Sequence, residues 1–262
     1  MEGAAPISLQ QSFWNEWNAS QREAAVDEVS RRQAAVVVGW LDALGRDSLD
    51  IVEVGCGAGW FCPELTRFGR VTATDLSDDV LARAQRRAPD VSFISGDFMN
   101  LDLGVQSFDV VVTLEVLSHV ADQAAFIEKL ANHLRPGGHL MMATQNRFVL
   151  QYLNHTGGPA PGQLRRWVDR RELRDLLEPQ FEVVQLFSVT PRVGRGTIGL
   201  LTKSDLKGRL RAMVGERPEP QEGRDPDQRR FAVRSRRWLV ERLEAIGLGW
   251  TLMALARRRV PA

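Results

Sequence analysis

The sequence lacks three features that would place the chain in a specialised class of protein. It has two cysteines, Cys56 and Cys62, and they lie in one predicted strand-to-helix turn, a poor frame for a structural disulfide. No apolar run approaches the roughly 18 residues that a membrane-spanning helix requires. Residues 1–10 lack a basic start followed by an apolar stretch, so no secretory signal is expected. We therefore expect a cytoplasmic protein in a reducing compartment, with no membrane segment.

The sequence also has no marked excess of charge of one sign. The net charge is +1, which argues against steering of the whole molecule towards nucleic acid. The segment 203–262, however, has 15 Lys and Arg against 8 Asp and Glu, a net charge of +7. This imbalance is typical of a solvated helical surface, and it would also attract an acidic acceptor or a nucleic acid. A hydrophobic fraction of 44% with 26% charged residues is typical of a globular protein and excludes disorder as the default state.

The apolar residues follow an alternation of strands and helices. Residues 49–54 form a near-continuous apolar run that ends in glycines, as expected for a strand buried on both faces. Asp169 and Glu172 are placed to cap a helix that ends before Pro179. Further strands are expected at 70–74, 91–94, 108–113, 139–144, 181–190 and 250–256. The pattern predicts an α/β, Rossmann-like, doubly wound and mostly parallel seven-stranded sheet with helices on both faces.

Four segments are expected in this order: an N-terminal helical lid segment at 1–45, the Rossmann-like core at 46–190, an insert at 191–247, and the last strand with a tail at 248–262. Ser20 and Glu23 have the spacing of a capping box and predict a helix that begins near Ser20 and runs to about Leu44. The insert is rich in Gly, Pro and charge. It is expected to form part of a substrate cap or an oligomer contact, as in a homodimer.

The most informative stretch is the glycine turn Gly55-Cys-Gly-Ala-Gly59, which follows the first strand. Glycines at such a turn let the backbone approach a ligand closely. A dinucleotide-binding turn would place its third glycine where this sequence has Trp60. Glu53 is a poor neighbour for a pyrophosphate but a good one for an ammonium or a sulfonium. Asp75 ends the second strand, where it would accept hydrogen bonds from ribose hydroxyls. Together these residues favour an adenosyl ligand without phosphates.

Five motifs carry a resemblance to a known family. They are Glu53-Val-Gly-Cys-Gly-Ala-Gly59, Asp75-Leu-Ser77, Gly96-Asp-Phe98, Phe108-Asp-Val-Val-Val-Thr-Leu-Glu-Val-Leu-Ser-His-Val120 and Leu134-Arg-Pro-Gly-Gly-His-Leu140. The stretch that contains them, about 50–144, resembles the class I S-adenosylmethionine-dependent methyltransferases, particularly the small-molecule branch that includes quinone-biosynthesis enzymes. The resemblance implies that S-adenosyl-L-methionine is the cofactor, that S-adenosyl-L-homocysteine is the product, and that a small molecule accepts the methyl group.

The resemblance also implies which residues bind the cofactor. The glycine turn would wrap the methionine moiety, Asp75 would bind the ribose, Asp97 would face the adenine amino group, and Phe98 would flank the ring. The expected cofactor-binding residues are Glu53, Gly55, Cys56, Gly57, Gly59, Asp75, Leu76, Asp97, Phe98, Leu114 and Glu115.

The reaction centre is expected beyond the fourth and fifth strands. Methyl transfer needs alignment of the acceptor and, for a hydroxyl nucleophile, removal of a proton. His119 is the first candidate for a general base, and the alternative is a structural histidine at the start of the next helix. His155, in the loop 147–161, is the second candidate, against a plain exposed histidine. Trp14 and Trp17 are interpreted either as a lid over the cofactor or as core anchors. No acidic pair or histidine cluster indicates a metal site.

The alternatives are weaker. A nucleic-acid methyltransferase that acts on base nitrogens would have an Asn/Asp-Pro-Pro-aromatic segment where this chain has Thr113-Leu-Glu-Val116. Trp60 and Glu53 disfavour a nicotinamide-dependent reductase. A non-catalytic module that binds S-adenosylmethionine stays open. The acceptor is not identified, nor is O- distinguished from N-methylation, but the basic balance makes a phosphorylated, carboxylated or sugar-acid acceptor more attractive than a quinone.

Overall fold

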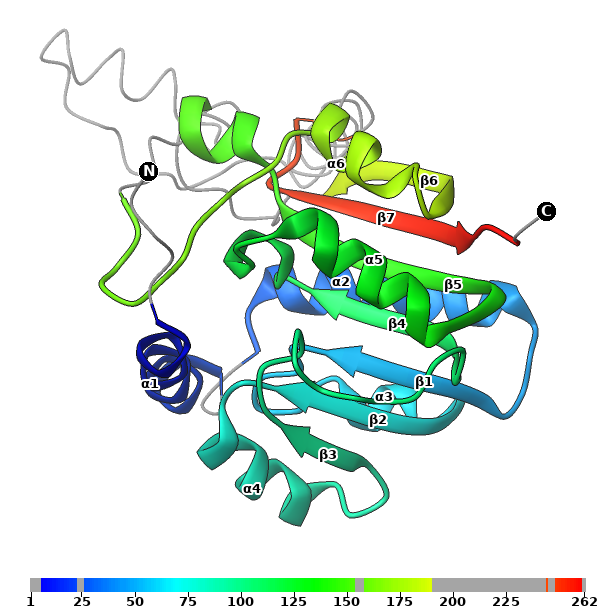
Figure 1. Cartoon of the computed structure of the whole chain (residues 1–262), viewed down its shortest axis with the longest axis horizontal. Coiled ribbons are helices and arrows are strands. Elements are labelled where there is room, and N and C mark those ends of the chain that lie inside the picture. The colour runs from blue at the N-terminus through cyan, green and yellow to red at the C-terminus, as the bar shows by residue number, and fades with distance from the viewer. Residues whose placement is uncertain (1–5, 23–25, 154–157, 190–243, 245–247, 261–262) are drawn as a thin grey trace, which may run out of the picture.

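A seven-stranded sheet with strand order β3-β2-β1-β4-β5-β7-β6 forms the centre of the molecule (Figure 1). The computed structural model describes residues 6–22, 26–153, 158–189, 244 and 248–260. The strands are β1 (Leu49–Val54), β2 (Gly69–Asp75), β3 (Ser92–Ser95), β4 (Phe108–Leu114), β5 (Leu134–Gln145), β6 (Phe181–Val189) and β7 (Thr251–Arg258). Strand β7 is antiparallel to both β5 and β6, and the other described pairs are parallel. The predicted α/β class with a mostly parallel sheet is confirmed.

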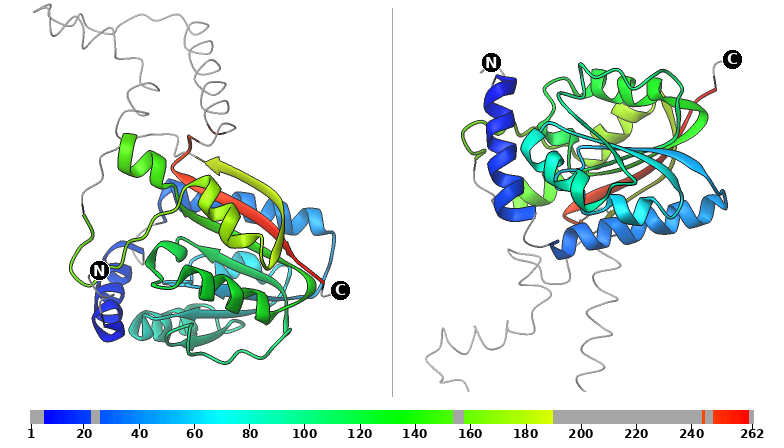
Figure 2. Two further views of the ribbon diagram at one scale, coloured as in Figure 1. Left: turned by 45° about the horizontal axis from the view of Figure 1, so that its top comes forward. Right: turned by 90° about the horizontal axis from the view of Figure 1, so that it is seen from below.

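Helices cover both faces of this sheet. The helical elements are α1 (Ile7–Trp17), the π-helical turn η1 (Asn18–Arg22), α2 (Glu28–Leu44), α3 (Cys62–Leu65), α4 (Asp78–Arg87), the 3-10 turn η2 (Leu117–His119), α5 (Gln123–His133), the π-helical turn η3 (Phe148–Leu153) and α6 (Arg170–Leu177). Helix α2 lies along one face, and α5 and α6 lie on the opposite face (Figure 2). Helix α1 stands apart from these layers, beside one end of the sheet (Figure 1).

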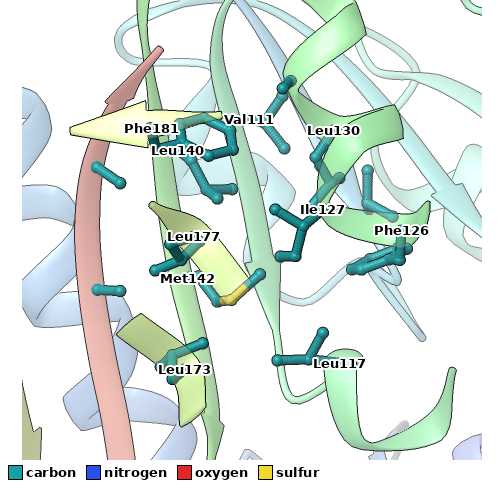
Figure 3. Packing of buried hydrophobic residues seen from close by; sticks show 14 of the residues in the cluster. Val111, Leu117, Phe126, Ile127, Leu130, Leu140, Met142, Leu173, Leu177 and Phe181 are labelled. Atoms are coloured by element: carbon teal, nitrogen blue, oxygen red, sulfur yellow. The ribbon is translucent and has the colours of Figure 1, made fainter. Parts of the chain in front are cut away.

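The two-residue period of the strands divides the core into two layers. In β4, Val111 points to the layer under α5 and α6, whereas Val110 and Val112 point to the layer under α2. Figure 3 shows the first layer, where Leu130 of α5 and Leu177 of α6 pack on the sheet. All five side chains are 0% exposed. Burial of each such side chain contributes about 1.5–3 kcal/mol, so these layers hold the strand ends in fixed relative positions.

The predicted start of the second helix is wrong. Helix α2 begins at Glu28, because the Asp27 carboxylate accepts a hydrogen bond of 2.7 Å from the backbone N–H of Ser30 and caps the helix. Ser20 instead lies in η1, where its hydroxyl donates to the carbonyl oxygen of Trp17 at 3.2 Å. Ser20 lies inside a helical turn, whereas the backbone of Asp27 is extended, as an N-cap requires, and this difference decides where the helix starts. The capping box of Asp169 and Glu172 on α6 is confirmed.

Some expected features lie outside the described residues. These are His155 and the insert 191–247 apart from Glu244. The carboxylate of Glu244 forms an ion pair of 2.6 Å with Arg32 of α2, and its backbone carbonyl accepts a hydrogen bond from the Ser188 hydroxyl of β6. Among the helices that the structure describes, none combines the length and the apolar character needed to cross a membrane.

Candidate functional site

A cavity of about 600 Å³ opens at the edge of the sheet where β1, β2 and β4 end. The chain order of the strands reverses between β1 and β4, and such a switch point is where open α/β sheets bind ligands. The cavity lining contains most of the residues that the sequence predicted for the site: Trp14, Trp17, Glu53, Gly55, Cys56, Gly57, Asp75, Leu76, Asp97, Phe98, Leu114, Glu115 and His119. The whole lining draws on residues as far apart in the sequence as Ile7 and Thr251.

The glycine turn has a backbone that only glycine adopts without strain. Gly55 and Gly57 have φ angles of +77° and +55°. A Cβ on Gly55 would lie 2.1 Å from Cγ2 of Val116, so a side chain there would collide with the segment after β4. The backbone N–H of Gly57 donates to Oδ2 of Asp75 at 2.7 Å, and the N–H of Ser77 donates to Oδ1 at 2.8 Å. Asp75 thus holds the turn in place while it lines the cavity.

Gly59 is predicted as a cofactor-binding residue, but it is not among the residues that line the cavity. Its φ angle is +68°, and a Cβ there would lie 3.0 Å from the Phe93 ring of β3 and 3.2 Å from Cβ of Ala84 in α4. Gly59 therefore allows the turn to pack closely against its neighbours, and a direct contact with a ligand stays a prediction.

Glu53 is a buried acid below the turn. Glu53 is 2% exposed, and the Cys62 thiol donates a hydrogen bond of 3.1 Å to Oε2 of Glu53. Burial raises the pKa of Glu53 to about 7, and the nearby negative charge of Asp75 adds to this effect. Burial also raises the pKa of the Cys56 thiol to about 11, so this thiol stays protonated at neutral pH. A cation bound beside Glu53 would favour the ionised carboxylate, which fits an ammonium or a sulfonium.

The Asp97 turn follows β3 on the far side of the cavity. Its Oδ1 accepts a hydrogen bond of 3.0 Å from the N–H of Met99, and Oδ2 accepts one of 2.8 Å from the side-chain amide of Asn100. The ring of Phe98 is 9% exposed and meets Phe126 of α5 edge-on, with 5.5 Å between ring centroids. This turn presents an anchored acid and an aromatic ring side by side, as recognition of a flat base with an amino group requires.

His119 lies at the end of η2. Its Nδ1 is 2.7 Å from the carbonyl oxygen of Leu164. A carbonyl oxygen only accepts, so Nδ1 carries the hydrogen and Nε2 has a lone pair. Burial lowers the pKa of His119 to about 4, and the positive charge of Arg165 contributes to the shift. The imidazole is therefore neutral at pH 7, where it accepts hydrogen bonds but is a weak base.

Helix α1 brings aromatic rings to the cavity. The ring of Trp14 meets the His119 imidazole at 4.6 Å between centroids, and Trp17 meets Trp14 at 5.6 Å. The side-chain amide of Asn15 donates to Oδ1 of Asp78, and that of Asn18 donates to Oγ of Ser77, both on the α4 side. These contacts hold α1 against the cavity.

The sequence reasoning missed a second group of lining residues: Asn18, Gln33, Gln163, Arg165, Trp167, Trp250 and Thr251. They come from η1, α2, the loop before α6 and the start of β7, and no motif contains them. Gln145, at the end of β5, lies where the sequence placed the reaction centre, beyond the fifth expected strand. The position of Trp250 and Thr251 at the start of the last expected strand was the one signal that could have found members of the group. Across the described part of the chain, no three His, Cys, Asp or Glu side chains are grouped to hold a metal ion.

Residues 52–142 match a family described as a methyltransferase domain. The chain is 33% identical over 142 residues to a "probable S-adenosylmethionine-dependent methyltransferase" of Mycolicibacterium smegmatis, over 53% of this chain and 54% of that protein. It is 35% identical over 106 residues to a ubiquinone biosynthesis O-methyltransferase of Rhodopseudomonas palustris, over 38% of this chain and 42% of that protein. The chain thus spans about half the length, or less, of these curated relatives.

A solved structure of similar fold is the 1,6-didemethyltoxoflavin-N1-methyltransferase of Burkholderia thailandensis with bound 1,6-didemethyltoxoflavin and S-adenosylhomocysteine. Its TM-score is 0.60 at 19% identity, and the match covers 99% of this chain and 93% of that one. A likeness at this identity shows a shared fold.

Proposed function

We propose that the chain transfers a methyl group from S-adenosyl-L-methionine to a small molecule. The cavity belongs to its class I S-adenosylmethionine-dependent methyltransferase domain. The observation that carries the proposal is a row of acids at the sheet edge. Glu53, Asp75 and Asp97 lie on or just after β1, β2 and β3, and each lines the same cavity. A ligand with a cationic end, a ribose and an amino-substituted base would find one acid for each part.

The lining residues fit this cofactor in chemistry and in space. Gly55 and Gly57 let Val116 and Asn18 pack closely against the turn, and both glycines line the cavity where the methionine part would lie. Glu53 would face the positive charges, and Asp75 would accept the ribose hydroxyls. Cys56, Leu76, Phe98 and Leu114 would form the remaining wall. When bound, S-adenosylmethionine supplies an electrophilic methyl group on a positively charged sulfur, from which an acceptor nucleophile takes it in line.

The residues of the chain would align the acceptor and exclude water. Trp14 and Trp17 on α1 would close over the bound molecules, since their rings line the cavity. His119 would accept a hydrogen bond from the acceptor through Nε2, because its imidazole is neutral at pH 7. The lowered pKa makes His119 better suited to orienting an acceptor hydrogen than to taking up a proton completely.

Calorimetry with the purified chain tests the cofactor. We expect S-adenosylmethionine to bind and NADH not to bind. Asp75→Ala should weaken S-adenosylmethionine binding by roughly 1–3 kcal/mol, because an acceptor of hydrogen bonds is lost. Asp79→Ala is the matched control, since Asp79 is exposed in the first turn of the neighbouring helix α4. Uptake of NADH in place of S-adenosylmethionine would refute the proposal.

Transfer is tested separately with methyl-labelled S-adenosylmethionine and a small-molecule fraction of cell extract. We expect label in at least one small product, and heat-inactivated protein is the control. Label that appears only in RNA would favour an RNA methyltransferase. Binding of the cofactor without transfer to any acceptor would favour a non-catalytic binding module.

A further inference from the structure

The lining acids that follow the strands divide into two groups along the sheet. The three acids proposed to face the cofactor belong to β1, β2 and β3, which form one half of the sheet order. Glu115 follows β4, and the next lining residues along the sheet edge are Gln145 at the end of β5 and Thr251 at the start of β7. Glu115 therefore lies between two halves of the cavity. The three acids line the half proposed for the cofactor, and the other half is left for the acceptor.

Side chains from two separate elements, α2 and β7, fix the Glu115 carboxylate. The Gln33 amide of α2 donates to Oε1 of Glu115 at 2.5 Å, and the Thr251 hydroxyl donates to the same oxygen at 3.2 Å. Gln33 and Thr251 are 1% and 3% exposed, so both donors are held by the surrounding packing. Convergence of α2 and β7 on one carboxylate just after β4 gives it a defined position at the cavity wall.

The backbone at Glu115 is strained. Its φ angle is +65°, a left-handed conformation that costs a residue with a side chain about 1–3 kcal/mol. The N–H of Glu115 donates to the carbonyl oxygen of Ala143 in β5 at 2.8 Å, which holds this conformation. A glycine would adopt it without strain, yet the chain carries a carboxylate there. Strain of this kind, observed at a cavity wall, points to a role for the side chain in binding.

The charge of the lining favours a cationic guest. Its carboxylates are those of Asp27, Glu53, Asp75, Asp97, Glu115 and Asp122, against the guanidinium of Arg165 and the imidazole of His119, which is neutral at pH 7. Asp27 and Asp122 cap α2 and α5 through hydrogen bonds to backbone N–H groups. Glu115 is the lining carboxylate that is neither a helix cap nor part of the proposed cofactor row.

We infer that Glu115 binds an amine group of the methyl acceptor. The inference rests on the proposed function, and it changes two expectations: Glu115 recognises the acceptor rather than the cofactor, and the acceptor is an amine rather than an acid. The basic segment 203–262 suggested an acidic acceptor, but the described wall of the cavity has an excess of carboxylates. Charge-assisted hydrogen bonds from an ammonium to a positioned carboxylate are about twice as strong as neutral ones.

Three probes with one ring and different polar groups test the inference: benzylamine, benzyl alcohol and benzoate. Each is titrated by ligand-observed NMR into the full chain saturated with S-adenosylhomocysteine. We expect benzylamine to bind most tightly. Glu115→Gln should weaken benzylamine binding about tenfold or more, because the charge is lost and the shape is kept. Glu128→Gln is the matched control, since it is the same substitution at an exposed position of α5 that does not line the cavity; it should bind benzylamine like the unaltered protein.

Each outcome decides the inference. Benzoate or benzyl alcohol that binds as tightly as benzylamine, or no benzylamine binding at all, would overturn it, as would equal benzylamine affinity in Glu115→Gln. Calorimetry with S-adenosylhomocysteine shows whether each variant is folded. If Glu115→Gln does not fold, the comparison of the three probes on the unaltered protein still decides the charge preference of the cavity. Failure of the unaltered protein to bind S-adenosylhomocysteine would refute the proposed function, whereas normal binding without a preference for the amine would refute only the role of Glu115.

Discussion

Replacing Glu53 with glutamine removes a buried negative charge and leaves a side chain of nearly the same shape. The glutamine oxygen can still accept the hydrogen bond that the Cys62 thiol donates to Glu53. Burial raises the pKa of Glu53 from 4.5 to about 7, with the charge of Asp75 contributing, so the ligand-free protein disfavours the ionised form. A pKa raised in the folded state makes a contribution to stability that is fully present below pH 4.5 and is lost as the pH rises through about 7.

The size of the effect follows from the shift. One pKa unit corresponds to about 1.4 kcal/mol, so the ionised carboxylate costs the ligand-free fold roughly 3 kcal/mol at pH 8. Glu53→Gln should therefore unfold with a free energy up to about 3 kcal/mol higher than the unaltered protein at pH 8, and the difference should disappear at low pH where both side chains are neutral.

The same variant should bind the cofactor less well. A cation beside Glu53 favours the ionised carboxylate, so the unaltered protein should bind S-adenosylmethionine about tenfold more weakly at pH 6, one unit below the pKa of Glu53, than at pH 8. Glu53→Gln should bind more weakly at pH 8 and lose this pH dependence. Its gain in stability and its loss of affinity have opposite signs, which separates a binding role from a purely structural one.

Urea unfolding of the ligand-free protein and calorimetry with S-adenosylmethionine, each at pH 6 and pH 8, measure both effects. Glu128→Gln, on the exposed side of α5, is the matched control and should change neither quantity. A Glu53→Gln protein with unchanged stability and unchanged affinity at pH 8 would refute the assignment of Glu53 as the counter-charge of a cationic ligand.

Three further predictions follow from the local geometry. Gly55→Ala should destabilise the fold by about 1–3 kcal/mol in urea unfolding and abolish binding of S-adenosylmethionine in calorimetry, because φ is +77° and the new Cβ meets Val116; normal binding would contradict this. Glu115→Gly should be about 1 kcal/mol more stable in urea than Glu115→Ala, because glycine relieves the strain at φ +65°, and equal stabilities would show that no strain is stored there. Burial lowers the pKa of His119 from 6.5 to about 4, so between these pH values the unfolded chain binds a proton that the folded chain does not, and the free energy of unfolding should fall by up to about 3 kcal/mol as the pH drops through this range. His119→Gln should reduce that fall in unfolding experiments from pH 7 to pH 4. An unchanged profile would exclude His119 as its source.

Much of the fold could be predicted from local patterns, and the errors fall at the ends of elements. The apolar run at 108–113 predicted β4 to within one residue, because a strand buried on both faces is apolar throughout. Strand β5 begins at Leu134 rather than at 139, since Leu134 pairs with Phe108 and the strand passes through the Pro-Gly-Gly turn. Helix α5 ends at His133, just before this Pro-Gly-Gly stretch, and pairing with β4 decided where β5 begins.

The site divides in the same way. The sequence located the acids and glycines that follow the strands, because in a parallel sheet the carboxyl ends of the strands share one edge. It did not locate Gln33, Arg165 or Thr251, which line the same cavity from a helix, a loop and an antiparallel strand. Nothing in their local sequence distinguishes these residues from other polar side chains.

By itself, the sequence determined the α/β class, the glycine turn and the acids at the ends of β1, β2 and β3, since each depends on neighbours within a few positions. The tertiary structure alone decided that the pKa of Glu53 is raised to about 7 and that the pKa of His119 is lowered to about 4, because burial sets both values. It also decided that Glu115 meets Gln33 and Thr251, which are 82 and 136 positions away along the chain. Contacts over such distances arise from packing of whole elements, and no local pattern encodes them.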